Sequence, residues 1–370
     1  MSSFALVGAT GISLVNFRFD LLKELTKQHE TVWAFAPDFS TEVQGKLSSI
    51  NVKMCIYPLD RTGISPFADI ATICSLRRSF KLHKINAVLL YTPKSVIYGS
   101  IAAYFAKVDE IYSMITGLGY AFSLNTIKSR VIRFIQTVLY KYALGKNNTV
   151  IFQNPDDLEQ FCSTQLVKSS KTVRVHGSGV NLEYFSEQGL PKNITFLMVA
   201  RLIKEKGVLE YLAAARIVKR SNPEAKFYLV GDVDTKSSSL ALPDIQSFID
   251  DGSVDYLGHL ADVRPAILKA SVFVLPSYRE GTPRSVLEAM AMARAIITTD
   301  VPGCRETVLN NINGFLVAAK SVDEIVVAMM KFIQNKNLAF EMGRSSYNIV
   351  RELYDVKLVN KDMLKIMGSS

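Results

Sequence analysis

Two carboxylates in the C-terminal half of the chain are spaced so that they can grip one extended ligand. Glu280 stands in a short segment that Gly281 and Pro283 break, and Glu288 follows about one turn into good helix sequence. The apolar run 271–275 before them predicts a buried strand. A helix that starts directly after such a strand and loop presents unpaired amides, which attract an anion such as a phosphate. Carboxylates in this arrangement can hold hydroxyl groups of a sugar nucleotide, which carries a hexose at one end and a ribose at the other.

Two cations further upstream stand in a loop that can bind a diphosphate. Arg201 and Lys206 follow an apolar run, 194–200, that predicts another strand, and a helical segment, 208–220, comes after Gly207. A guanidinium can bind two phosphate oxygens at once, whereas an ammonium acts as a mobile point charge. Because basic loops are common, this pattern is weak by itself, and the two carboxylates taken alone can equally be solvated charges.

The stretch around the carboxylates resembles a known motif. Residues 276–291 read P-S-Y-R-E-G-T-P-R-S-V-L-E-A-M-A. This is similar to the E-x7-E motif of retaining family 4 glycosyltransferases of the GT-B fold, including the flanking P-S, E-G-x-P and E-A-M-A. The loop of Arg201 and Lys206 matches the R-x4-K-G element of the same family. The resemblance extends over essentially the whole chain and is sharp from Arg201 to Gly314.

The resemblance implies a role for each of these residues. Arg201, Lys206 and Glu280 would be catalytic, because the cations stabilise charge on the leaving β-phosphate and Glu280 faces the donor sugar. The other donor-side residues would line the nucleotide: Gly281, Thr282 and Pro283 beside the diphosphate, Glu288 on the ribose, and Gly258 and His259 against the nucleobase. Relatives react with retention at the anomeric carbon through front-side attack and without a bound metal. Neither a metal nor a cofactor is therefore expected.

Composition and the alternation of segments indicate a two-domain α/β enzyme. A chain of 370 residues with 48% apolar and 21% charged residues exceeds one ordinary core and is typical of a globular protein. Strand-like runs alternate with helix-like segments, which predicts parallel sheets covered by helices on both faces. The resemblance implies the GT-B fold, in which two doubly wound Rossmann-like domains face a cleft. We expect an acceptor-binding domain over 1–188, a nucleotide-sugar-binding domain over 189–350, and a C-terminal helix, 351–370, that crosses back to the first domain.

A glycine-rich turn follows the first predicted strand. The residues 8–11 read G-A-T-G and could open a dinucleotide fingerprint, but Leu14 stands in place of the third glycine. The next strand also lacks a closing acidic residue, because Pro37 intervenes before Asp38. We therefore expect this turn to bring backbone close to a phosphate or a sugar at a helix start, rather than to bind a nicotinamide cofactor.

The segment after this turn carries the expected acceptor side. Residues 14–18, L-V-N-F-R, resemble a pattern in the branch that builds bacterial surface glycans on polyprenyl diphosphate. The resemblance makes Gly11 and Arg18 candidates for the acceptor side, although Arg18 could equally be a solvated helix arginine. Thr116 and Gly117 follow a later strand at the same rim, where many relatives carry a histidine. Thr116 in its place puts a histidine-assisted step in doubt.

A net charge of +9 indicates an anionic partner. The segment 127–146 combines an apolar body with five cations and no acidic residue, which is typical of a basic amphipathic helix on an anionic membrane surface; a core-packing helix is the alternative. No zinc-finger, KH or RNP signature indicates nucleic acid. No signal peptide or spanning segment is recognisable, and the four cysteines are scattered, which suits a reducing compartment. We expect a cytoplasmic protein that is peripheral on the inner face of the cytoplasmic membrane.

Together these observations predict a retaining hexosyltransferase. It would move a hexose or N-acetylhexosamine from a UDP-sugar to a polyprenyl-diphosphate-linked saccharide, in the assembly of a surface polysaccharide such as O-antigen or capsule. A sugar-nucleotide epimerase on the same architecture is the alternative, although the four scattered histidines offer it no evident acid or base. A nicotinamide-dependent oxidoreductase and a non-catalytic sugar-nucleotide-binding regulator are further alternatives.

Overall fold

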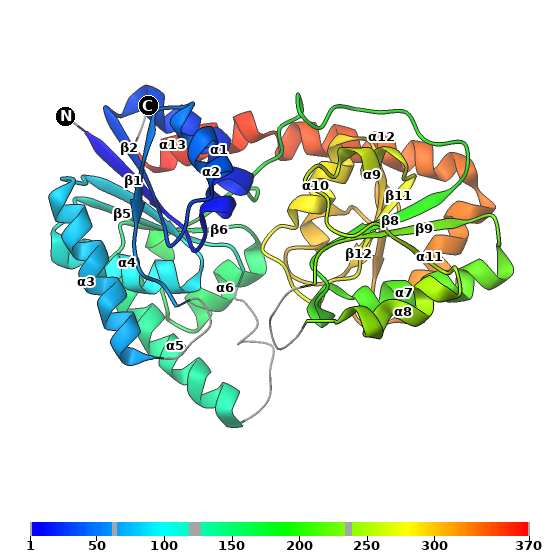
Figure 1. Ribbon diagram of the computed structural model, residues 1–370, viewed down its shortest axis with the longest axis horizontal. Helices are drawn as coiled ribbons and strands as arrows, with labels where there is room; N and C mark the ends of the chain where they lie inside the picture. The colour runs from blue at the N-terminus through cyan, green and yellow to red at the C-terminus, as the bar shows by residue number, and fades with distance from the viewer. Residues whose placement is uncertain (1, 61–64, 118–126, 234–238, 369–370) are drawn as a thin grey trace. The chain divides into compact units, whose positions relative to one another are not determined.

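The chain folds into two compact units, each with its own parallel sheet (Figure 1). A computed structural model describes residues 2–60, 65–117, 127–233 and 239–368. Unit 1 comprises Met1–Ser178 together with Val359–Ser370, and unit 2 comprises Gly179–Leu358. The chain therefore leaves the first unit once and returns to it at its C-terminal end.

Seven parallel strands form the sheet of unit 1 within the described residues, in the order β3-β2-β1-β4-β5-β6-β7. The central strands are short, apolar on both faces and buried, as expected for a parallel sheet with helices on both sides. The strands are β1 (Ser3–Val7), β2 (Thr31–Ala36), β3 (Val52–Ile56), β4 (Ala87–Tyr91), β5 (Glu110–Ile115), β6 (Thr149–Phe152) and β7 (Thr172–Arg174).

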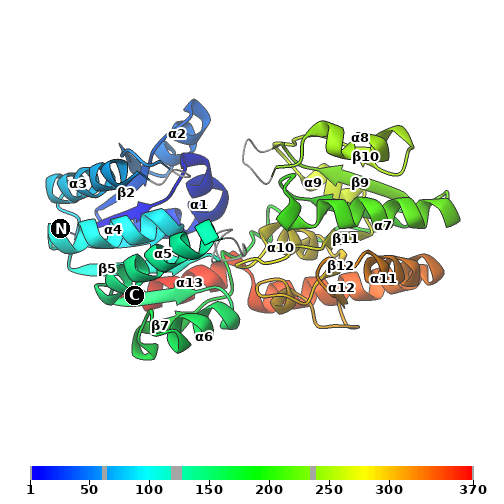
Figure 2. The same ribbon diagram turned by 90° about the horizontal axis from the view of Figure 1, so that it is seen from below.

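Helices cover both faces of this sheet and make two separate core layers (Figure 2). One layer holds α1 (Gly11–Gln28), α2 (Thr41–Ser48) and the C-terminal helix α13 (Val356–Ile366). The other holds α3 (Pro66–Leu82), α4 (Pro93–Ala106), α5 (Ile127–Gly145) and α6 (Pro155–Ser163). Val359 and Met363 of α13 pack in the same core as Phe4 and Leu6 of β1. The predicted return of the C-terminal helix to the first domain is thus confirmed.

Unit 2 contains a six-stranded parallel sheet in the order β10-β9-β8-β11-β12-β13. Its strands are β8 (Thr195–Val199), β9 (Lys226–Val230), β10 (Asp255–Tyr256), β11 (Val272–Leu275), β12 (Ala295–Thr299) and β13 (Gly314–Val317). Helix α7 (Val208–Ser221) contacts α8 (Leu242–Asp250) and α11 (Val322–Gln334), whereas α10 (Arg284–Ala291) contacts α12 (Lys336–Leu353). The short helix α9 (Arg264–Leu268) lies on the crossover from β10 to β11.

The strand order of both sheets creates a switch point. In unit 2 the chain steps outward from β8 to β9 and β10, then restarts on the other side of β8 with β11. In unit 1 the same reversal occurs between β1 and β4. Ligands of such sheets bind beyond the carboxyl ends of the strands at this point, because the loops on either side diverge there. The predicted class, two doubly wound α/β domains, is confirmed, and it fixes where each site must lie.

The first and last residues of unit 2 run side by side, at the two points where the chain passes between the units. The backbone N–H of Val180 donates to the carbonyl of Tyr354 at 2.8 Å, and that of Val356 donates to Val180 at 3.0 Å. Gly179 has a φ of +69°, and a Cβ there would lie 2.6 Å from the Cα of Val356. The helical C-terminal segment is interrupted at these hydrogen bonds: α12 (Lys336–Leu353) ends at Leu353, and α13 begins at Val356.

A glycine inside α12 allows this helix to approach the turn between α10 and β12. A Cβ on Gly343 would lie 2.2 Å from the carbonyl oxygen of Ala293, which is backbone and cannot move aside. Ala293 itself has a left-handed φ of +62°. Glycine adopts this conformation without strain, whereas the Cβ of an alanine makes it costly. The packing of α12 therefore depends on having no side chain at 343.

We predict that Gly343→Ala lowers the free energy of unfolding by about 1–3 kcal/mol, since the added methyl group overpacks a backbone contact. The matched control is Gly45→Ala in α2, where a Cβ would meet no atom within 4 Å. That change should stabilise the protein by about 0.5–1 kcal/mol through helix propensity alone. Calorimetric unfolding of both variants tests the pair, and a Gly343→Ala protein as stable as wild type would contradict this packing.

Candidate active site at the switch point of unit 2

The predicted donor-side residues gather around the switch point between β8 and β11. Arg201 and Lys206 lie in the loop after β8, and Glu280 lies in the loop after β11. These two strands are adjacent in the sheet, although the loops are more than seventy residues apart in sequence. The parallel topology therefore brings together what the sequence separates.

Close backbone packing holds the two loops against each other. The loop after β8 ends in a 3-10 turn (Lys204–Lys206) and in Gly207, which has a φ of +71°. A Cβ on Gly207 would lie 2.1 Å from the carbonyl oxygen of Pro276. Only glycine satisfies both the positive φ and this approach, which gives the final glycine of R-x4-K-G a physical reason.

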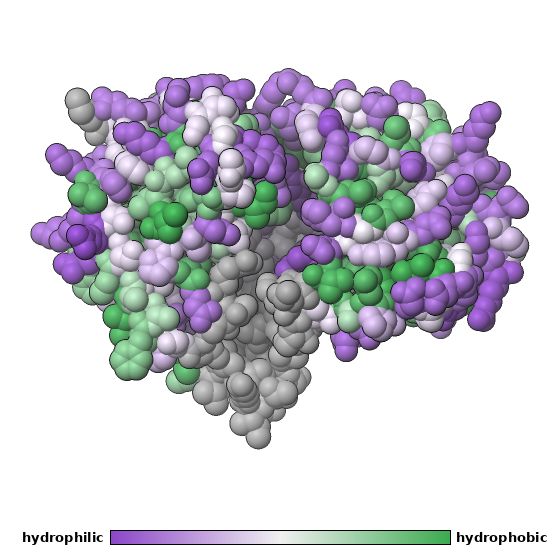
Figure 3. All heavy atoms as spheres, in the orientation of Figure 1, coloured by the Kyte–Doolittle hydropathy of each residue, from purple (hydrophilic) through white to green (hydrophobic). Residues whose placement is uncertain are grey.

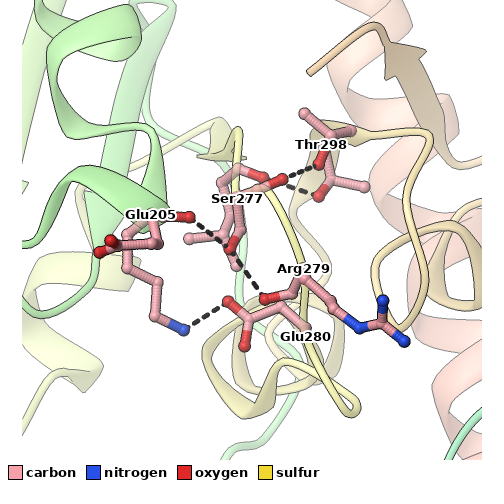
Figure 4. A network of polar contacts seen from close by, with 8 residues as sticks. Glu205, Ser277, Arg279, Glu280 and Thr298 are labelled. Carbon is pink, nitrogen blue, oxygen red and sulfur yellow. Dashed lines mark hydrogen bonds and ion pairs between the residues drawn. The ribbon is translucent and has the colours of Figure 1, made fainter. Parts of the chain in front are cut away.

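Ser277 joins three segments around the site (Figure 4). Its hydroxyl donates to the carbonyl of Glu205 at 3.1 Å, and its own carbonyl accepts from the hydroxyl of Thr299 at the end of β12. The backbone N–H of Tyr278 donates to the same Glu205 carbonyl at 2.8 Å. The side chain of Ser277 is fully buried, so these bonds are shielded from water. Sequence reasoning gave Ser277 no role, although P-S belongs to the motif.

Lys206 and Glu280 form an ion pair at the centre of the site (Figure 4). Their side chains are 20% and 12% exposed, so the pair is largely shielded from solvent but still accessible. The N–H of Glu280 donates to the carbonyl of Pro302 at 3.0 Å, and a Cβ on Gly303 would lie 2.3 Å from the Glu280 carbonyl. The turn of Pro302 and Gly303 thus packs against the backbone of the Glu280 loop. The sequence shows a glycine at 303, but it could not predict that this glycine contacts Glu280.

The other basic side chains of these loops are placed differently. Arg201 is exposed at the start of its loop, just beyond the carboxyl end of β8. The guanidinium of Arg279 points away from the carboxylate of Glu280 (Figure 4). Lys206 contacts the carboxylate of Glu280 directly.

Helix α10 begins where the sequence predicts it. Gly281 and Pro283 are buried and Thr282 is half-buried, and the helix starts at Arg284 without an acidic residue or a side-chain cap in its first turn. The positive end of the helix dipole of α10 therefore follows the Glu280 loop directly, where it favours an anion. Within the described residues, no group of three or more histidine, cysteine, aspartate or glutamate side chains is arranged to hold a metal ion.

Glu288 lies one turn into α10 with its carboxylate largely buried. Burial raises the pKa of Glu288, and the neighbouring guanidinium of Arg284, with its Nε 3.0 Å from Glu288 Oε1, acts in the opposite direction. The side chain retains 14% exposure. The carboxylate is therefore held by the helix and by Arg284, with a restricted opening to solvent.

Gly258 and His259 follow β10 at the same edge of the sheet. Gly258 has a φ of +69°, and its carbonyl accepts from the N–H of Gly231 at 2.9 Å. This bond ties the loop to the end of β9. His259 is exposed. Backbone groups of this loop are thus fixed while the imidazole is free to turn.

The predicted acceptor-side residues lie in unit 1 and are described separately. The N–H of Gly11 donates to Asp38 at 3.0 Å, so this carboxylate is engaged by the glycine turn itself. Arg18 is only 3% exposed, with its Nη2 2.7 Å from the sulfur of Met114 and its guanidinium over the ring of Tyr91. It is not a solvated helix arginine.

The second pair of predicted acceptor-side residues follows β5. Thr116 and Gly117 are half-buried directly after this strand, and Gly117 has a φ of +111°. The rest of that loop, 118–126, lies outside the described residues.

The match to a known protein family lies within unit 2. Residues 193–335 match the family described as Glycosyl transferases group 1. This range includes Arg201, Lys206, Glu280 and Glu288.

Two curated proteins are similar over most of the chain. The N,N'-diacetylbacillosaminyl-diphospho-undecaprenol alpha-1,3-N-acetylgalactosaminyltransferase of Campylobacter jejuni is 28% identical over 370 residues, covering 96% of both chains. The UDP-Gal:alpha-D-GlcNAc-diphosphoundecaprenol alpha-1,3-galactosyltransferase of Escherichia coli is 28% identical over 331 residues, which is 84% of this chain and 82% of that protein.

Two solved structures share the architecture. HepE from Anabaena in complex with UDP-glucose superposes with a TM-score of 0.80 over the full length of both chains, at 14% identity. Sucrose-phosphate synthase from Thermosynechococcus elongatus gives a TM-score of 0.79 over 99% of this chain and 98% of that one, at 16% identity. These likenesses establish the fold. The family match places residues 193–335, with the motif residues of unit 2, in the group 1 glycosyltransferases, the retaining family 4 enzymes of the GT-B fold.

Proposed function

We propose that this enzyme transfers a hexose or N-acetylhexosamine from a UDP-sugar to a saccharide linked to a polyprenyl diphosphate, in the assembly of a surface polysaccharide. The observation that carries the proposal is the Lys206–Glu280 pair at the switch point of unit 2, inside the part of the chain that matches the family. The two relatives support this choice of donor and acceptor. Their names describe N-acetylgalactosaminyl and galactosyl transfer, and both names include a diphospho-undecaprenol-linked sugar.

The catalytic roles follow from where charge develops. Breaking the bond between the anomeric carbon and the β-phosphate leaves negative charge on that phosphate. Lys206, Arg201 and the first amides of α10 stabilise it, and preorganised groups of this kind supply the largest share of such catalysis. Attack by the acceptor hydroxyl on the face of the leaving phosphate accounts for retention, and the acceptor proton passes to the phosphate oxygen. Glu280 orients the donor sugar through its hydroxyl groups.

The proposal also assigns the contacts with the rest of the donor and with the acceptor. Gly281, Thr282 and Pro283 border the diphosphate, Glu288 accepts from the ribose, and the loop of Gly258 and His259 packs on the nucleobase through its backbone. On the acceptor side, the proposal uses Gly11, Arg18, Thr116 and Gly117 at the carboxyl edge of the unit 1 sheet. The functional division remains the one expected from the sequence: residues 1–188 for the acceptor, 189–350 for the nucleotide sugar, and 351–370 as the returning helix.

A membrane-facing role for α5 belongs to the same proposal. Tyr140, Ala143 and Leu144 of α5 pack into the core of unit 1, whereas Phe134 and Val138 are 69% and 52% exposed. The helix thus satisfies the core-packing alternative and also presents an apolar outer face. Large apolar side chains are also exposed at the start of α3 (Figure 3).

The basic composition of the segment 127–146 and the net charge of +9 fit an anionic lipid surface. Among the described residues, no helix is both long and apolar enough to cross a bilayer. We therefore propose that the enzyme works peripherally, on the inner face of the cytoplasmic membrane.

We expect Lys206→Ala to lower kcat/KM by roughly 10²–10³-fold, because it removes a cation from the leaving phosphate. The assay combines purified enzyme, a panel of UDP-hexoses and UDP-N-acetylhexosamines, and a polyprenyl-diphosphate-linked saccharide. Lys204→Ala is the matched control, since Lys204 is exposed in the same turn and should change the rate less than about twofold. Near-normal turnover by Lys206→Ala, or no transfer by the wild type from any UDP-sugar, would overturn the proposal.

We expect Glu280→Gln to bind UDP about three- to tenfold more tightly than wild type, although it transfers sugar poorly. The reason is that the diphosphate and the Glu280 carboxylate compete for Lys206, and the amide removes the competitor. Isothermal titration with UDP measures the effect. Glu341→Gln, an exposed change on α12, serves as the control. Weaker UDP binding by Glu280→Gln would mean that the carboxylate supports the nucleotide instead of competing with it.

We expect Val138→Asp to reduce co-sedimentation with anionic phospholipid vesicles by at least about threefold, because it places a carboxylate in the apolar face of α5. Val327→Asp on α11 is closely matched, since Val327 is 57% exposed against 52% for Val138. It should leave the pelleted fraction unchanged. Equal losses for the two variants, or no loss for either, would remove α5 from the membrane contact.

A further inference from the structure

Arg284 and Glu288 form a partly buried ion pair on successive turns of α10. The Nε of Arg284 lies 3.0 Å from Glu288 Oε1, and the two side chains are 21% and 14% exposed. The family motif over residues 276–291 implies no function for Arg284. The pair sits at the position that the proposed function gives to the ribose.

The surroundings of Glu288 favour the neutral carboxyl group. Burial raises the pKa of Glu288 most strongly, and the negative charge of Asp262 adds to the rise. Arg284 is the group that lowers it. Burial of a carboxyl group disfavours its charged form, and a cation held against it favours that form again.

Asp262 is itself largely neutralised by a second arginine. Arg264 donates from Nε to Asp262 Oδ1 at 2.9 Å and from Nη2 to Oδ2 at 2.7 Å. The charged groups that shift the pKa of Glu288 are Arg284 on its own helix and Asp262, which Arg264 pairs at the start of α9. Of these, only Arg284 contacts the Glu288 carboxylate at hydrogen-bond distance.

We propose that Arg284 is a positioning residue for the donor nucleotide, which fixes the Glu288 carboxylate in one orientation and keeps it ionised as the acceptor of the ribose hydroxyls. The inference rests on the proposed contact between Glu288 and the ribose. On this inference, the affinity for the nucleotide depends on Arg284, although Arg284 itself need not contact the nucleotide.

The chemistry of the ribose explains why the ionised form matters. Its two adjacent hydroxyl groups are both donors, and a carboxylate offers two acceptor oxygens. Hydrogen bonds to the charged form are roughly twice as strong as neutral ones. A protonated carboxyl group instead carries a donor on one oxygen and matches the two hydroxyls less well. Binding that needs the carboxylate is thus lost as pH falls through the pKa of Glu288.

The test is the affinity for UDP as a function of pH, measured by isothermal titration between about pH 6 and pH 8.5. Each variant is expressed as a ratio to wild type at the same pH, so that protonation of the UDP phosphate cancels. Arg284→Met should bind UDP about tenfold more weakly at high pH, with a ratio that worsens further as pH falls. Arg284→Lys should restore much of the affinity. Arg216→Met, which breaks an ion pair with Asp251 elsewhere in unit 2, should give a ratio near one throughout.

The double variant Arg284→Met with Glu288→Gln separates positioning from folding. Without a titratable carboxyl group its ratio to wild type should no longer steepen as pH falls, and melting curves of every variant report the fold. A ratio for Arg284→Met that is constant with pH overturns the inference even if UDP binds normally to wild type and weakly to Lys206→Ala. Failure of wild type to bind UDP would instead bring down the proposed function, and this inference with it.

Discussion

The close contact between the loop after β8 and the loop after β11 is the constraint on which the donor site depends. Gly207 lies against the carbonyl of Pro276, where a Cβ would be at 2.1 Å, and Ser277 and Tyr278 both donate to the carbonyl of Glu205. These contacts hold together two loops that follow adjacent parallel strands, so the loops cannot move apart without breaking them. Lys206 and Glu280 meet because this packing brings their loops together.

Much of the fold was predictable from local patterns. Short apolar runs alternating with helical segments specify parallel sheets, and right-handed crossovers restrict the strand orders that such runs can adopt. The order 3-2-1-4 itself comes from the structure. The candidate residues were found because chemistry and spacing agreed over a long motif. Their partners were not predictable, because Lys206 meets Glu280 across more than seventy residues and Gly303 supports Glu280 from a third loop. A sequence shows which side chains can do chemistry, whereas the sheet order decides which of them meet.

Unit 1 shows where single residues resist interpretation from sequence. Arg18 could be a solvated helix arginine, yet it is buried against Met114 and Tyr91. Asp38 stands near the place where a dinucleotide fold carries a ribose-binding acid, yet it accepts from the N–H of Gly11. This engagement weighs against the oxidoreductase alternative. Helix α5 packs one side into the core of unit 1 and exposes apolar groups on the other, so its membrane contact stays a proposal. For Arg18 and Asp38, neighbours in three dimensions decide between interpretations that the sequence leaves open.

Both carboxylates of the motif are paired with cations within this structure, Glu280 with Lys206 and Glu288 with Arg284. A half-buried carboxylate without a partner would be costly, so these pairs stabilise the site before a donor arrives. Under the proposed function the two pairs set different conditions for binding. A diphosphate would compete with Glu280 for Lys206, and the carboxylate would then turn to the donor sugar. The ribose would need no such exchange, because its hydroxyl groups would donate to a carboxylate that Arg284 already holds.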